Sequence, residues 1–171
     1  MKTKKGVSGV ISMLLIVLLV FVTVGILWAT ISGLIKDRTG ESESCFGNFG
    51  KMEINSKYTC YNSSANETVF SIERKDIDLD ELLISISSEG QGHSIELLIT
   101  PRSDLEELTN YQRNDEVVLP GKNSGSTYYL DMNKISFQTK PTSIKIAPVI
   151  NGHQCEVIDT LEIIDDCEVL L

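Results

Sequence analysis

Four cysteines are the residues whose spacing points most directly to chemistry. Cys45 and Cys60 lie fifteen residues apart, Cys155 and Cys167 lie twelve apart, and none belongs to a CxxC pair. This arrangement disfavours a zinc site and favours two disulfides formed in an oxidising compartment. Three pairings are open to four cysteines. The similar spacing favours crosslinks between the first and last strands of a domain, either Cys45–Cys155 with Cys60–Cys167 (parallel strands) or Cys45–Cys167 with Cys60–Cys155 (antiparallel strands).

Two asparagines form N-glycosylation motifs in a polar stretch after the second cysteine. The motifs are Asn62-Ser63-Ser64 and Asn66-Glu67-Thr68, with the two asparagines four residues apart. If this part of the chain lies outside the cell, we expect both asparagines to be acceptors for N-linked glycan.

The remaining polar residues form no catalytic or metal-binding pattern. The alternating carboxylates of residues 76–80 resemble the start of a calcium loop, but Glu81 stands where that loop requires glycine and Ser87 where it requires glutamate. His93 and His153 each lie next to a glycine, in expected loops. The sequence also contains no nucleophile elbow and no phosphate loop. We therefore expect no enzymatic activity, no bound metal and no cofactor.

These residues all follow a long apolar segment. Residues 6–35 contain no charged side chain and are flanked by Lys4-Lys5 and by Lys36. At 1.5 Å per residue, a helix of this length would measure about 45 Å, more than the roughly 30 Å hydrocarbon core of a bilayer. We predict a hydrophobic helix over residues 7–38 that crosses a membrane, with the basic N-terminus in the cytoplasm and the rest of the chain outside.

The charge balance limits the partners of the rest of the chain. The net charge is -9, from 15 basic and 24 acidic residues. Without Lys2, Lys4 and Lys5 the balance becomes 12 basic against 24 acidic residues, or -12. A domain this acidic repels phosphate groups. We therefore expect it to bind neither nucleic acid nor anionic lipid.

After a predicted polar hinge at residues 39–43, the apolar pattern changes to a period of two. This alternation predicts half-buried strands. The run Glu89–Gly92 predicts a hairpin turn, and Ser103–Leu108 has the spacing of a short helical turn. We expect residues 44–171 to form an all-β Ig-like sandwich, which makes the whole chain α+β. The predicted strands lie around residues 70–72, 82–86, 95–99, 116–119, 127–130, 144–146 and 161–163.

The start of the apolar segment contains a processing pattern. Lys4-Lys5-Gly6 is followed by Val7-Ser8-Gly9-Val10-Ile11 and then by the apolar helix. This arrangement resembles the class III signal of archaeal type IV pilins, which a membrane-embedded prepilin peptidase cuts after the glycine. The resemblance implies a basic leader at residues 1–6, recognition through Lys4 and Lys5, and cleavage between Gly6 and Val7. Gly9 stands where many archaeal pilins have proline, and Ile11 stands where bacterial pilins have glutamate.

Cleavage at that bond would prepare the helix for assembly. It removes three positive charges, after which the helix can leave lipid and bury its apolar surface against the helices of other copies. Gly25, Ala29 and Gly33 recur every four residues and would let such helices approach closely.

The resemblance therefore implies a pilin. We expect the pilus assembly machinery to build it into a homopolymeric extracellular filament, with the sandwich outside and adhesion as its role. A single-span, membrane-anchored extracellular binding module is the alternative from another class, and a minor pilin or archaellin-like subunit is the alternative within this class.

Overall fold

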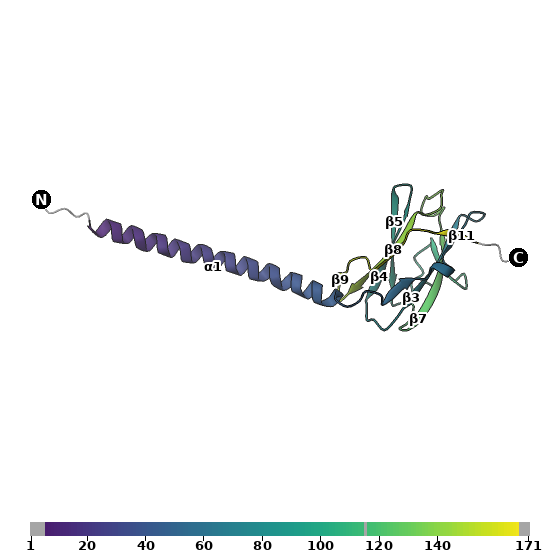
Figure 1. The fold of residues 1–171 in the computed structure, drawn as a ribbon, viewed down its shortest axis with the longest axis horizontal. Helices are drawn as coiled ribbons and strands as arrows, with labels where there is room; N and C mark the ends of the chain where they lie inside the picture. Colours follow the sequence, from purple (N-terminus) through teal and green to yellow (C-terminus); the bar gives the residue numbers. More distant parts are fainter. Residues whose placement is uncertain (1–5, 115, 168–171) are drawn as a thin grey trace. The chain divides into compact units, whose positions relative to one another are not determined.

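The computed structural model describes residues 6–114 and 116–167, and the chain divides between Glu43 and Ser44 into two compact units. The first unit is helical, and the second contains two β-sheets (Figure 1). The predicted α+β class, an N-terminal apolar helix followed by a β-rich domain, is confirmed.

Helix α1 runs without interruption from Gly6 to Cys45. Residues 39–43, expected to form a hinge, are helical instead. The single Gly40 lowers helix stability by only about 1 kcal/mol, and the segment contains no proline to break the hydrogen-bond ladder. The helix ends two residues before Gly47, whose φ of 81° is the left-handed conformation that commonly terminates helices.

The first sheet has the strand order β11-β2-β3-β7-β6, and β1 pairs with β3 beside β2. All of its pairings are antiparallel except that of β11 with β2. A short 3-10 helix, η1 (Ser56–Tyr58), connects β1 to β2. The strands of this sheet are β1 (Met52–Ile54), β2 (Cys60–Asn62), β3 (Glu67–Arg74), β6 (Leu108–Asn110), β7 (Ser124–Asp131) and β11 (Asp165–Asp166).

The second sheet has the strand order β10-β8-β4-β5, and β9 also pairs with β8. Its pairings are all antiparallel. The predicted hairpin joins β4 to β5 through Glu89 and Gly90, whose φ values of 47° and 81° match a two-residue turn of the type I′ kind. The strands of this sheet are β4 (Glu81–Ser88), β5 (Gln91–Leu98), β8 (Ser143–Ile150), β9 (His153–Gln154) and β10 (Asp159–Leu161).

The two sheets share one hydrophobic core in a sandwich-like arrangement. Phe70 of β3 and Tyr128 of β7 belong to the same buried cluster as the apolar residues of β4 and β8. In β4 the predicted alternation is realised fully, because Leu82, Ile84 and Ile86 are all completely buried.

The sequence patterns failed where strand pairing decided the structure. Residues 116–119 form no strand, and Val117 makes only an isolated bridge to Arg102. Residues 103–108 form no helix: a single turn closes from the Leu108 N–H to the Leu105 carbonyl at 3.2 Å, and Leu108 then begins β6 and pairs with Leu130. A single helical turn has little stability of its own, so pairing with β7 prevails.

Candidate functional site

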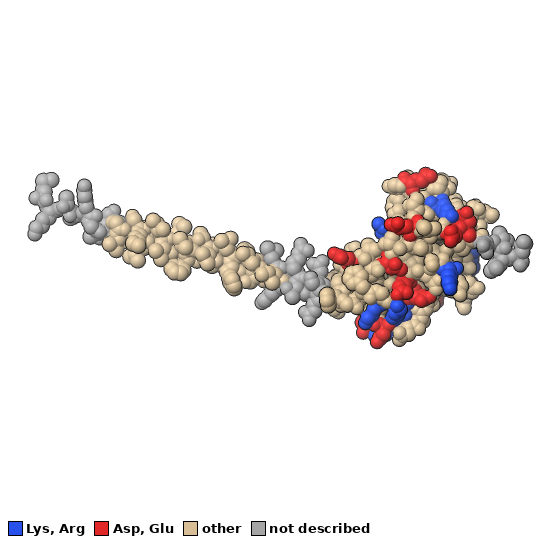
Figure 2. Space-filling view, in the orientation of Figure 1, with Lys and Arg blue, Asp and Glu red and all other residues tan. Residues whose placement is uncertain are grey.

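The segment of α1 from Gly9 to Gly33 is apolar around its whole circumference. Its 25 residues have a mean hydropathy of 3.1, and none of its most apolar window is buried. The seven consecutive residues from Leu14 to Val20 are all exposed, so no face is covered by the rest of the described chain. Figure 2 shows no acidic or basic side chain on this segment, whereas the β-rich unit carries both kinds. Such a helix is stable only in apolar surroundings.

The geometry of this segment suits a membrane. Twenty-five residues of helix extend roughly 37 Å, enough to cross a hydrocarbon core of about 30 Å with some tilt. Two of its hydroxyls are bonded within the helix: Thr23 Oγ1 donates to the Val20 carbonyl at 2.9 Å, and Thr30 Oγ1 to the Leu27 carbonyl at 2.9 Å. These internal bonds reduce the cost of moving the two threonines into an apolar environment.

The predicted small-residue stripe lies on this segment. Residues spaced by four positions share one face of a helix, so Gly25, Ala29 and Gly33 lie together. A Cβ built on Gly25 or Gly33 would meet nothing within 4 Å, which leaves room for a second helix. Of the predicted cleavage residues, Gly6 and Val7 begin α1, and Lys4 and Lys5 lie outside the described residues.

The four cysteines form two disulfides, Cys45–Cys155 and Cys60–Cys167, which is the first of the two pairings favoured by the spacing. The second bridge joins neighbouring parallel strands, because Cys60 belongs to β2 and Cys167 directly follows β11. The first bridge differs from the expectation, because Cys45 is the last residue of α1 and not part of a strand. Two disulfides in a domain of this size are typical of an oxidising compartment.

The two glycosylation motifs have different surroundings. The Asn62 Oδ1 accepts hydrogen bonds from the backbone N–H of Ser64 and of Ala65, and its amide nitrogen makes no bond to another described residue. The Asn66 amide nitrogen donates to Asn133 Oδ1 at 2.8 Å and to the Phe137 carbonyl at 3.1 Å. A glycan is attached through this nitrogen, so Asn62 is the accessible acceptor of the pair.

Two of the three aspartates in the acidic run at residues 76–80 are paired with one lysine. Lys122 Nζ lies 3.3 Å from Asp76 Oδ1 and 2.6 Å from Asp78 Oδ1. The hydrogen bond from Lys122 lowers the pKa of Asp78, and the same bond raises the pKa of Lys122. Within the described part of the chain, no group of three or more His, Cys, Asp or Glu residues is arranged to hold a metal ion.

The two histidines are not brought together. His93 lies in β5, with its Nε2 at 3.6 Å from Glu107 Oε1, and His153 lies in β9 with an exposed side chain. Each is placed by its own strand, and neither is part of a nucleophile or ligand cluster among the described residues.

A groove of about 830 Å³ lies on the outer face of the first sheet. Its floor is formed by β3 and β7, where Ser71 is opposite Thr127 and Glu73 is opposite Gly125. These residues alternate with core residues such as Ile72, so they point away from the core. The floor is hollow because Ser71, Gly125 and Thr127 have short side chains or none. At Gly125 a Cβ would lie only 3.3 Å from the Ile72 carbonyl oxygen and 3.4 Å from Glu73 Cγ.

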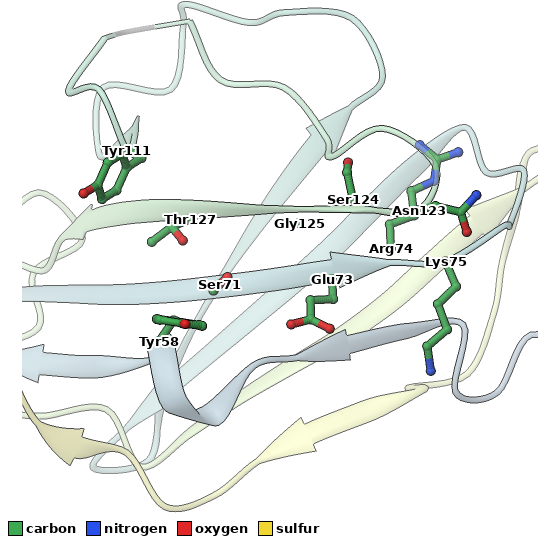
Figure 3. Close-up of a pocket in the computed structure, with 10 residues that line it drawn as sticks. All are labelled: Tyr58, Ser71, Glu73, Arg74, Lys75, Tyr111, Asn123, Ser124, Gly125 and Thr127. Atoms are coloured by element: carbon green, nitrogen blue, oxygen red, sulfur yellow. The ribbon is translucent and has the colours of Figure 1, made fainter.

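Two tyrosines flank this floor (Figure 3). Tyr58 comes from η1 and is 65% exposed, and Tyr111 follows β6 and is 70% exposed. We call this feature the tyrosine groove. Sequence analysis did not single it out, because its residues carry no motif. The available signal was the run of four short side chains, Ser124-Gly125-Ser126-Thr127, at the start of β7.

No protein-family model, curated protein or solved structure matched the chain. The structure therefore defines an α+β protein with an uncovered N-terminal apolar helix and a doubly disulfide-bonded β-rich domain, and its function must be argued from these features.

Proposed function

We propose that the chain is a structural subunit of an archaeal type IV-like pilus, assembled through α1. The observation that carries the proposal is the uncovered apolar surface of α1 from Gly9 to Gly33. The core of the β-rich unit contains no residue of this segment, so the helix has no partner within the described chain. Its apolar surface must be covered by lipid, by the helices of other copies, or by lipid first and by those helices after assembly.

The energetics favour both environments over water. Eighteen large apolar residues of α1 are exposed, and burial of each contributes roughly 1.5–3 kcal/mol. Their sum exceeds the 4–15 kcal/mol that association costs in lost freedom of motion. A helix taken from lipid is therefore stable in a filament only if neighbouring copies cover its surface.

The β-rich unit suits the outside of such a filament. Its two disulfides match an oxidising space, and its open sequon at Asn62 would accept a glycan there. We propose that this unit faces solvent and mediates adhesion, while α1 forms the shaft. In this proposal the protein has a structural role and no catalytic one.

The experiment is expression of the full chain in an archaeal host with its own prepilin peptidase and pilus machinery. Fibres sheared from the cells are examined by electron microscopy and mass spectrometry. We expect filaments whose subunit begins at Val7. A chain found only in the membrane fraction, with residues 1–6 attached, contradicts the proposal.

Two variants test whether cleavage is the controlling step. Gly6→Arg places a bulky cation at the cut site, and we expect uncut protein and no filaments. The control is Gly9→Ala, where an added Cβ meets nothing within 4 Å, and we expect normal filaments. Normal filaments from Gly6→Arg would refute the processing model.

A single-span anchor for an extracellular binding module is the second candidate. The span of 25 residues favours it, since this length already matches a bilayer without any assembly. The two candidates predict that the protein is found in different cell fractions in the same experiment. A pilin is found in the sheared fibres, whereas an anchor stays in the membrane fraction with its leader intact. A minor pilin would appear in the fibres at low abundance.

A further inference from the structure

We propose that the tyrosine groove is a binding site for a neutral saccharide. The inference does not depend on filament assembly, because every residue of the groove belongs to the β-rich unit. It goes beyond the proposed structural role, since it assigns a ligand class to a defined surface.

The flanking rings offer flat apolar surfaces to a ligand. Neither Tyr58 nor Tyr111 has a hydrogen-bond partner for its hydroxyl among the described residues, and both rings are mostly exposed. Tyr111 stacks on Tyr129, with centroids 6.3 Å apart and planes at 28°, and the Arg113 guanidinium lies 3.9 Å from the centre of the Tyr129 ring. This stacking orients Tyr111 before any ligand arrives, which lowers the entropy cost of binding. Aromatic faces of this kind suit the C–H faces of sugar rings.

The floor offers polar groups with unused hydrogen-bonding capacity. Thr127 has a hydroxyl and Asn123 a side-chain amide without a partner in the described chain, and Figure 3 shows both at the groove. Glu73 Oε1 accepts a bond from Asn55, and its second carboxylate oxygen has no partner among the residues that the structure describes. Hydroxyl, amide and carboxylate groups supply both donors and acceptors, which is what the hydroxyls of a sugar require.

The basic residues near the groove do not act as anion binders. The buried Arg74 guanidinium donates to the Ile77 carbonyl at 2.7 Å and to the Pro120 carbonyl at 3.0 Å. Lys75 Nζ bonds the Gly50 carbonyl at 2.8 Å and Glu53 Oε1 at 2.6 Å, and Figure 3 shows it directed away from the tyrosines. The groove therefore presents one carboxylate and no free cation among its described lining residues, in a chain of net charge -9. This charge disfavours anionic ligands.

Other ligand classes fit less well. An apolar ligand would remove water from Glu73 and Thr127 without replacing its hydrogen bonds, which is costly. A polypeptide cannot pair with β3, which has β1 and β2 on one side and β7 on the other. On β7, β6 pairs only with residues 128–130, so a strand added to residues 124–127 would extend the sheet beside the floor and would not fill the groove. A neutral polyol can form hydrogen bonds with the polar groups of the floor and stack on the two tyrosine rings at the same time.

The test uses the full chain in phosphocholine-detergent micelles, which contain no sugar. Binding to a microarray of neutral oligosaccharides and of uronic-acid oligosaccharides is measured first. The best neutral oligosaccharide is then titrated by isothermal calorimetry. We expect binding to at least one neutral oligosaccharide and none to the uronic acids.

The variants locate the site. Tyr58→Ala and Tyr111→Ala each remove an exposed ring, and we expect binding to weaken by about tenfold or more. Thr127→Phe fills the space between the rings and should abolish binding. The matched control is Phe49→Ala, which removes an exposed ring outside the groove (66% exposed) and should leave binding unchanged.

Three results overturn the proposal. They are no binding to any neutral oligosaccharide, stronger binding to the uronic acids than to the neutral ones, and unchanged binding by the tyrosine variants. Thermal unfolding of each variant accompanies the titrations. Wild-type melting temperatures show that a lost affinity comes from the groove and not from misfolding.

Discussion

At the scale of single residues, Asn66 illustrates how a modification motif can be used by the fold itself. Its side chain donates to Asn133 and Phe137 and accepts from the Tyr61 hydroxyl at 2.8 Å. Its backbone has a φ of 51°, a conformation that asparagine tolerates better than most residues. The side chain therefore holds the β2–β3 turn against the segment that follows β7, and its amide nitrogen is not available to a glycan.

The two sequons can be separated by mutation. We expect Asn66→Ala to lower the free energy of unfolding by about 2–4 kcal/mol, because it loses three hydrogen bonds and places alanine at positive φ. Asn62→Ala should cost about 1 kcal/mol or less, since it loses only local bonds to a turn. Denaturant unfolding with the disulfides intact measures both, and equal losses would contradict this assignment.

Glycopeptide mapping checks the same difference in the native protein. We expect any N-linked glycan at Asn62 and none at Asn66. A glycan on Asn66 would mean that its amide is modified before the turn closes.

At the scale of elements, short strands depend on covalent support. β2 and β11 contain three and two residues, and β11 pairs with nothing but β2 among the described strands. A two-residue parallel strand has few ladder bonds. The Cys60–Cys167 disulfide directly beside this pair, together with the bond from the Cys167 N–H to the Tyr61 carbonyl at 2.8 Å, holds β11 on the sheet.

Removing each disulfide in turn should separate its effect on the stability of the whole unit from its effect on the neighbouring strands. The bridged cysteines are 107 residues apart for Cys60–Cys167 and 110 for Cys45–Cys155. Loop entropy therefore predicts nearly equal losses of about 3–5 kcal/mol for either double serine variant. Only Cys60→Ser with Cys167→Ser should also release β11.

Amide hydrogen exchange measures the release of β11 in the variant that carries Cys60→Ser and Cys167→Ser. We expect the amide of residue 167 to lose protection in this variant and to keep it in the variant without the Cys45–Cys155 bridge. Retained protection in both would show that strand pairing alone holds β11.

At the scale of the whole molecule, the apolar segment of the first unit contributes nothing to the hydrophobic core of the second. The hydrophobic core and the residues packed against it begin at Cys45 and include no residue of the apolar segment Gly9–Gly33. Both disulfides also lie within residues 44–171. The β-rich unit thus has its own core and crosslinks, and the first unit contributes surface that must be covered from outside.

A fragment of residues 44–171 should therefore fold alone. We expect it to be soluble and monomeric without detergent, with both disulfides formed and with a melting temperature within a few degrees of that of the full chain in micelles. Circular dichroism, thiol titration and analytical ultracentrifugation measure these properties. An unfolded or aggregated fragment would show that α1 is needed for the fold.

The amino-acid sequence alone determined the apolar helix and the main strands. The helix follows from an uncharged run, and β4 follows from the alternation at Leu82, Ile84 and Ile86, which the structure realises. Both patterns relate residues only a few positions apart, so local periodicity is enough to predict them. The two sequons and the four cysteines could also be recognised in the sequence, but their spatial arrangement could not.

Only the tertiary structure decided how distant residues meet. The choice between two disulfide pairings depended on β11 lying parallel to β2, and the tyrosine groove depended on Ser71 lying opposite Thr127. Strand pairing brings these residues together, and its register is set by burial of the whole core rather than by neighbours in the chain. For this reason the apolar character of the helix is a property of composition, whereas the crosslinks and the groove are properties of the fold.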